Sequence, residues 1–176
     1  MTIAERAAAQ EARIRIRNAC VQIERFAGRY AQTIREIQFA VDPSLSVGMK
    51  VSVDKVCRYR PDFVLSLETS ALAGALLHEC AHVLENHHGR ALEMLDEVAD
   101  WFTWQVAADL HANALVLAAS DRFSLPDGVL LPEAFDLPSS WSASGYFLAL
   151  RRGGFDSSWT RRIRHTESAH AWVTLS

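Results

Sequence analysis

Residues 68–90 read ETSALAGALLHECAHVLENHHGR and set two histidines and a glutamate into an otherwise apolar run. The apolar residues around them predict a helix that runs from the start of this stretch to about His88, with Gly89 as its C-cap. On such a helix His78 and His82, four residues apart, project from one face. Polar side chains in the apolar centre of a helix are costly to bury unless something pairs them, and a metal ion does so directly.

His78, Glu79 and His82 together form the motif H-E-x-x-H. In zinc peptidases this motif supplies two zinc ligands, and its glutamate is the general base for a zinc-activated water. We therefore predict that His78 and His82 bind Zn²⁺, that Glu79 is catalytic, and that the substrate is a peptide or protein. The alternatives are a catalytically silent zincin-like binding or scaffold module, which has no need of a general base, and a structural zinc site with four protein ligands.

A catalytic zinc needs a third protein ligand beside an open position for water. His88 lies six residues after His82, the spacing of metzincins, but Glu85 stands where that pattern has glycine. His87 is worse placed than His88. Two acids of the following segment, Glu97 and Asp100, are further alternatives.

Asp109 is the candidate that the helical rise favours. A chain that reverses after Gly89 and starts a new helix near Asp100 climbs back to the level of the histidines in roughly nine residues. Glu97 and Asp100 would then lie near the turn, about two helical turns too low. We predict Asp109 as the third ligand, and we expect Asn113, one turn further along, to orient its carboxylate or to contact the bound water.

The composition is that of an ordinary globular domain of 176 residues, with 49 % hydrophobic residues, 22 % charged residues and a net charge of −3. A chain of this length buries a core of its own, so we expect residues 1–176 to form one domain. The net negative charge gives no reason to expect a nucleic-acid partner. Three cysteines without C-x-x-C spacing, no leader and no membrane-spanning apolar run predict a cytoplasmic protein with no membrane partner.

The periodicity predicts an α+β fold that is mainly helical. Residues 1–36 read as a helical scaffold, with Thr2 and Glu5 as a capping box, a break at Gly28 and a second helical piece over 30–38. Alternating residues near 48–60 predict a small β-hairpin, closed by Pro61, beside the H-E-x-x-H helix.

The remainder of the chain is predicted to be helical and then irregular. Residues 92–119 read as helix in two pieces hinged near Asp100, and Ser142 is suited to cap a short helix that ends at Arg151. The core is expected over 37–150, and 151–176 read as an irregular tail.

Three segments in order resemble a known family: RYRPDFVLSLETSALAGALLHECAHVLENHHGRA (58–91), WQVAADLHAN (104–113) and LPDGVLLPEAFDLPSSWSASGYFLALRR (125–152). They resemble the bacterial putative metallopeptidase domain that commonly precedes a von Willebrand factor A-like domain. The matching positions are Tyr59, Pro61, Asp62, Phe63, His78, Glu79, His82, His87, His88, Arg90, Trp104, Ala107, Ala108, Asp109, Asn113, Ser142, Ala143 and Tyr146. The sequence departs from the pattern at Arg60, where the family has Asn, and at Ser144-Gly145, where it has an acidic pair.

The resemblance implies a zincin-like fold and peptidase activity. It also implies association with a MoxR-type ATPase or a von Willebrand-like partner. Beside the ligands, we expect His87, His88 and Tyr146 to support the ligands or to stabilise an oxyanion.

Overall fold

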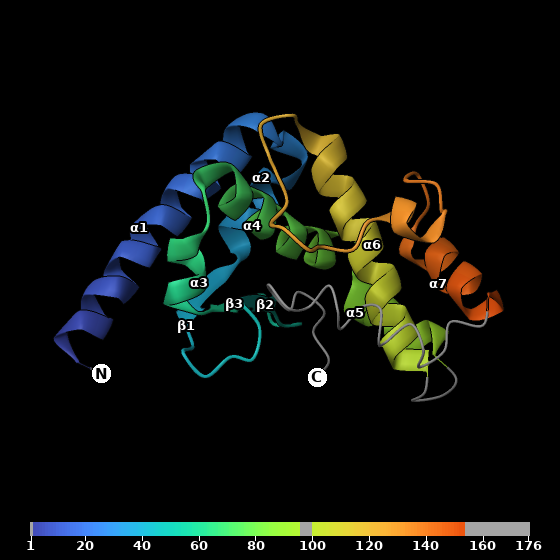
Figure 1. Cartoon of the computed structure of the whole chain (residues 1–176), viewed down its shortest axis with the longest axis horizontal. Helices are drawn as coiled ribbons and strands as arrows, with labels where there is room; N and C mark the ends of the chain where they lie inside the picture. The colour runs from blue at the N-terminus through green and yellow to red at the C-terminus, as the bar shows by residue number, and fades with distance from the viewer. Residues whose placement is uncertain (1, 96–99, 154–176) are drawn as a thin grey trace.

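The computed structural model describes residues 2–95 and 100–153, and it is mainly helical with a small three-stranded sheet, as an α+β fold requires. Figure 1 shows α1 and α7 at opposite ends of the molecule, with α4 and α6 between them. Glu97 and most of the predicted tail lie outside the described residues. That the whole chain forms a single domain stays a prediction.

The N-terminal helix α1 (Ile3–Phe26) begins as predicted. Thr2 Oγ1 accepts from the Glu5 amide at 3.2 Å, and the Glu5 carboxylate accepts from the Thr2 amide at 2.6 Å, so the capping box is complete. The chain then breaks at a 3₁₀ turn, η1 (Gly28–Tyr30), before the short helix α2 (Ala31–Glu36). The buried face of α1 packs into the larger of two hydrophobic clusters.

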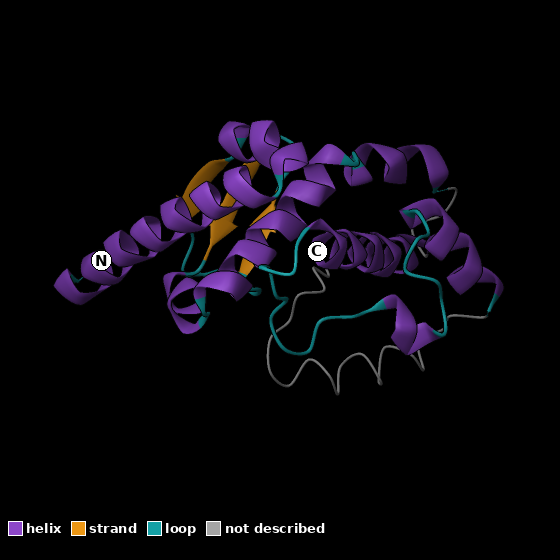
Figure 2. Ribbon diagram, turned by 90° about the horizontal axis from the view of Figure 1, so that it is seen from above, coloured by secondary structure: helices purple, strands orange, loops and turns teal. Residues whose placement is uncertain are grey.

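The predicted hairpin is present as β2 (Met49–Val51) and β3 (Val56–Tyr59), which pair antiparallel. A further strand, β1 (Gln38–Val41), pairs parallel with β3, so the order is β1-β3-β2 and β2 is an edge strand. In Figure 2 the three strands lie on the side of α1, away from α7.

The last strand ends at Tyr59, just before Pro61, and Pro61 itself starts a short helix that the sequence did not predict, α3 (Pro61–Ser66). Proline is favoured at the first helical position because its missing N–H needs no partner there. The Arg15 guanidinium of α1 donates to the carbonyls of Leu65 (2.8 Å) and Leu67, which satisfies the end of α3.

The motif helix α4 (Thr69–Leu84) ends earlier than predicted, and the expectation that it reaches His88 with Gly89 as C-cap is wrong. Asn86 adopts the left-handed conformation, with φ of 51°, and a new helix α5 (His87–Met94) starts directly after it. Asn is one of the few side chains that tolerates this conformation at a helix end. Gly89 instead lies inside α5, where a Cβ would come within 2.4 Å of the Asn86 side chain.

The second half of the described chain is built on α6 (Trp101–Ala119), which follows Asp100 as predicted. A 3₁₀ turn, η3 (Pro132–Phe135), leads to α7 (Ala143–Arg152). Ser142 caps the N-terminus of α7, because its Oγ accepts a hydrogen bond of 3.3 Å from the Gly145 amide. Among the described residues, no helix is both long and apolar enough to cross a membrane.

Two hydrophobic clusters meet at α6. The larger cluster combines α1 to α4 and the sheet with Ala112 and Val116 of α6. The smaller cluster combines Trp104, Ala107 and Leu110 of α6 with α5 and α7. The stretch of α6 around residue 109 therefore lies at the junction of the two clusters, facing α4.

Candidate metal centre

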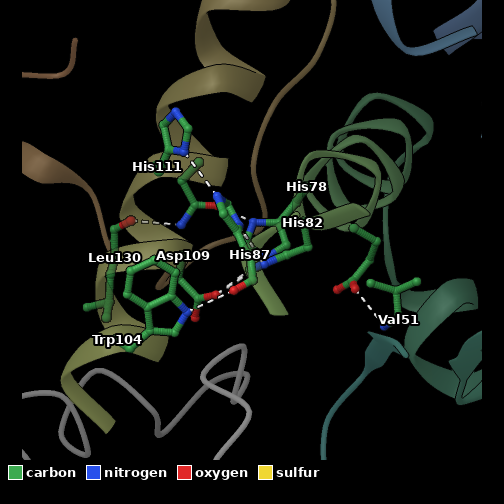
Figure 3. Close-up of polar contacts among 10 residues, drawn as sticks. Val51, His78, His82, His87, Trp104, Asp109, His111 and Leu130 are labelled. Atoms are coloured by element: carbon green, nitrogen blue, oxygen red, sulfur yellow. Dashed lines mark hydrogen bonds and ion pairs between the residues drawn. The ribbon is translucent and has the colours of Figure 1, made fainter. Parts of the chain in front are cut away.

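Two helices bring three ligand atoms together at this junction. His78 and His82 come from α4 and Asp109 comes from α6, and one ligand atom of each lies within 4.8 Å of the others. Nε2 of His78 lies 2.9 Å from Nε2 of His82 and 3.7 Å from Oδ1 of Asp109. Nε2 of His82 lies 3.2 Å from the same oxygen. Figure 3 shows the three side chains pointing toward one another.

These separations fit a zinc ion. Nitrogen and oxygen ligands held about 2.0–2.1 Å from zinc at tetrahedral angles lie roughly 3.3 Å apart. The three distances of 2.9, 3.2 and 3.7 Å scatter about that value. The His₂-carboxylate donor set is also one that zinc prefers. The residues present therefore fit zinc with three protein ligands.

Burial keeps both histidines in the neutral form that a metal requires. Desolvation lowers the pKa of His78 to about 4, with the neighbouring His82 acting in the same direction. Desolvation, together with His88 and His111, lowers the pKa of His82 to about 3. At neutral pH both imidazoles thus keep a lone pair available for a cation.

Burial has the opposite effect on the third residue, because it disfavours the charged carboxylate. The pKa of Asp109 rises to about 7, although His78 opposes the rise. A buried carboxylate facing two neutral imidazoles lacks a compensating positive charge, and a divalent cation would supply it.

Glu79 lies next to the three ligand atoms without belonging to their group. Its Oε2 accepts a hydrogen bond of 2.7 Å from the Val51 amide of β2 (Figure 3). Desolvation raises the pKa of Glu79 to about 8, and the Val51 hydrogen bond opposes the rise. The carboxylate lines the same pocket of about 180 Å³ as His78, His82 and Asp109. A buried carboxyl group beside a candidate metal site is an arrangement that suits metal-assisted hydrolysis.

Asn113 orients a histidine and not the aspartate, which corrects the expectation from sequence. Its Oδ1 lies 2.8 Å from Nδ1 of His78, and its Nδ2 donates to the Leu130 carbonyl at 2.8 Å. Because a carbonyl only accepts, the amide nitrogen must face Leu130 and the amide oxygen must face His78. His78 therefore carries its proton on Nδ1, and its Nε2 lone pair is left on the side of His82 and Asp109.

A line of further histidines continues from His82. Nδ1 of His82 lies 3.0 Å from Nδ1 of His87, and Nε2 of His87 lies 3.0 Å from Nδ1 of His111. The sequence singled out His87 but not His111, which shares no metal-ligand spacing with the motif and comes beside it only through the packing of α6.

The other sequence candidates lie elsewhere. Asp100 is the N-cap of α6 and its carboxylate is 3.5 Å from the Arg151 guanidinium, so it links α6 to α7. His88 lines the pocket but is not in the three-residue group. Tyr146 is buried in the smaller cluster and donates its hydroxyl to the Pro138 carbonyl at 2.7 Å, which is a structural role. Glu97 is outside the described residues.

The chain was compared with known protein families, curated proteins and solved structures. A family described as a putative metallopeptidase domain matches residues 7–171, which is nearly the whole chain. No curated protein and no solved structure matches.

Proposed function

The chain belongs to the putative metallopeptidase domain family, and on that premise we propose that it is a zinc-dependent peptidase with a zincin-like fold. His78, His82 and Asp109 are the proposed zinc ligands, and Glu79 is the proposed general base. The observation that carries the proposal is the convergence of the three ligand atoms within 4.8 Å in a pocket that Glu79 also lines.

Zinc, when bound, polarises a substrate carbonyl and lowers the pKa of a water molecule. The chain itself supplies the proton transfers. Glu79 accepts a proton from the attacking water and delivers it to the amide nitrogen that leaves when the C–N bond breaks. The Val51 amide holds Oε2 at 2.7 Å, so Oε1 is the oxygen that we assign to the moving proton.

A peptide substrate is proposed to lie in extended form along the edge of β2 that does not pair with β3. The Ser52 amide donates to Val56 and the Arg60 amide donates to Gly48, so residues 48, 50 and 52 face β3. The backbone groups of Met49 and Val51 consequently face away from β3, toward α4. Because Glu79 already takes the Val51 amide, the substrate must pair with the remaining groups of this edge.

Three protein ligands favour a catalytic site over a structural zinc site. A structural zinc is held by four protein side chains, whereas a catalytic one leaves a position open. Over residues 2–95 and 100–153 the candidate group consists of His78, His82 and Asp109. A silent scaffold is the other alternative, and a buried general base in the same pocket argues against it. Association with a MoxR-type ATPase or a von Willebrand-like partner stays a prediction.

The proposal is tested by metal analysis and proteolysis on the same preparations. Purified chain is expected to hold about one zinc and to cleave unstructured peptides. Glu79→Gln is expected to keep the zinc and lose the cleavage, whereas Asp109→Asn is expected to lose both. Zinc binding without cleavage of any peptide in a diverse library would favour the scaffold, and a chain that binds no zinc would refute the proposal.

A further inference from the structure

The histidines that continue from His82 form a single chain across three helices. His82 belongs to α4, His87 is the first residue of α5, and His111 belongs to α6. Two contacts of 3.0 Å join their rings in series, as Figure 3 shows. His87 is 2 % exposed, so its ring nitrogens depend on protein partners, whereas His111 is only half-buried.

The direction of every hydrogen bond in this chain follows from its first member. If Nε2 of His82 faces a metal ion with its lone pair, the ring proton is on Nδ1 and is donated to Nδ1 of His87. That atom must then be an acceptor, so the proton of His87 is on Nε2 and is donated to Nδ1 of His111. The opposite assignment at His87 would set two N–H groups against each other at 3.0 Å.

We propose that His87 and His111 are positioning residues that hold His82 in its metal-binding tautomer, although neither contacts the metal. The inference rests on the zinc site of the proposed function and extends it to His87 of α5 and His111 of α6. It parallels the action of Asn113 on His78, so each of the two histidine ligands has its own orienting partner.

The backbone around His87 is built to hold this ring. The left-handed Asn86 turns the chain sharply after α4 and brings residue 87 back onto residue 82. Trp104 Nε1 donates to the His87 carbonyl at 3.1 Å and so ties the start of α5 to α6. The bend between α4 and α5 therefore has a defined consequence at the metal centre.

Paired substitutions at position 87 separate hydrogen bonding from packing. His87→Leu fills similar space but leaves the His82 Nδ1–H without an acceptor, and we expect zinc affinity to fall roughly 10–100-fold. His87→Asn places an amide oxygen at about the position of Nδ1, so we expect its zinc affinity to stay within about threefold of wild type. Affinities are measured by competition with a chelator of known strength, on protein whose folding is checked by circular dichroism.

A second pair at His111 carries the test if His87→Leu does not fold. His111→Leu removes the acceptor for His87 Nε2–H, and we expect a loss of roughly tenfold in zinc affinity. His111→Asn restores an acceptor oxygen and is expected to restore the affinity. His88→Leu is the matched control, since it removes the neighbouring imidazole of α5 and leaves the chain of three intact.

The possible outcomes are distinct. The inference is supported if the Leu variants lose zinc affinity and the Asn variants at the same positions restore it. Leu variants that bind zinc like wild type overturn it, and so do Asn variants that lose as much affinity as their Leu counterparts. In both cases wild-type zinc binding would leave the proposed function standing. A wild-type chain that binds no zinc overturns the proposed function and this inference together.

Discussion

Replacing Asp109 by Asn should stabilise the metal-free protein and at the same time weaken its affinity for zinc. Asn has nearly the shape of Asp but offers a neutral amide oxygen in place of a carboxylate. Burial raises the pKa of Asp109 from an ordinary 3.8 to about 7. In the metal-free protein, stability is therefore lost as the pH rises from about 4 to about 7, because the unfolded chain ionises first.

The size of this loss of stability follows from the difference between the two pKa values of Asp109. Each pH unit between the two pKa values is worth about 1.4 kcal/mol, so the carboxylate destabilises the metal-free fold by a few kcal/mol at pH 8. Asp109→Asn escapes this cost, and we expect the metal-free variant to be more stable than wild type at pH 8. At pH 4 we expect the difference to be small, since the carboxyl group is then protonated in the fold.

Zinc should narrow this difference in stability, because wild type gains more from the metal than the variant does. Loss of an outer hydrogen-bonding partner already weakens metal sites roughly 10–100-fold, so loss of a direct ligand should cost more than about 100-fold. At a free zinc concentration 1,000 times the wild-type dissociation constant, wild type gains about 4 kcal/mol and a variant weakened 100-fold gains about 1.4 kcal/mol. Urea unfolding at pH 8, with chelator and with buffered zinc, measures both states.

Matched variants decide between the candidate ligands. Asp100→Asn and His88→Leu should bind zinc like wild type, because Asp100 faces Arg151 and His88 is outside the three-residue group. Glu97→Gln tests the remaining alternative. The reasoning is refuted if Asp109→Asn keeps zinc within about tenfold of wild type while His88→Leu or Glu97→Gln loses it.

Four further substitutions have outcomes that the structure predicts. Glu79→Gln should retain zinc while peptide hydrolysis falls by at least about 10³-fold; wild-type turnover in this variant would rule out Glu79 as the base. Without metal, Glu79→Gln should become more stable relative to wild type as the pH rises from about 4.5 to about 8, because over this range the raised pKa of Glu79 lowers the stability of the wild-type fold. Urea unfolding midpoints measure this difference. Asn113→Leu removes the hydrogen bonds that Asn113 makes with His78 Nδ1 and with the Leu130 carbonyl, and should cost about 2–5 kcal/mol in unfolding free energy. It should also lower zinc affinity; unchanged zinc affinity would show that Asn113 does not orient His78. Gly74→Ala should destabilise the fold by about 3 kcal/mol or more, because the new Cβ would lie 2.0 Å from the Ser124 carbonyl oxygen. Gly28→Ala is the control: its Cβ would have no atom within 4 Å, so the fold should keep its stability or gain slightly. Thermal melts measure both variants, and equal effects would contradict the packing argument.

Local signals in the sequence were enough to predict where α1 and α7 start and which side chains share the motif face of α4. Thr2 with Glu5 and Ser142 cap the helices that they were predicted to cap, because a cap depends on residues three apart. The hairpin of β2 and β3 follows from alternation and a turn. His78 and His82 face the same direction because of helical periodicity alone.

Local signals failed where several residues compete for one conformation. Gly89 looks like the better C-cap, yet Asn86 takes the left-handed position and Gly89 packs against it inside α5. Glycine is favoured at a helix end, but a break after Leu84 allows two contacts that stabilise it: His87 with His82, and Trp104 with the His87 carbonyl. The helical start at Pro61 was missed because proline marks both the end of a strand and the first turn of a helix.

The sequence by itself thus determined which side chains are available at the centre: two histidines on one helical face, a glutamate between them, and a small set of acids for a third position. It also predicted Asp109 from helical rise, and the structure brings that residue to the two histidines. Only the tertiary structure decided which partners orient them. Asn113 bonds His78 and not Asp109, and His111 joins through His87. Such pairings depend on how far and at what angle α6 packs against α4 and α5, and that packing is set by buried side chains distributed over the whole chain.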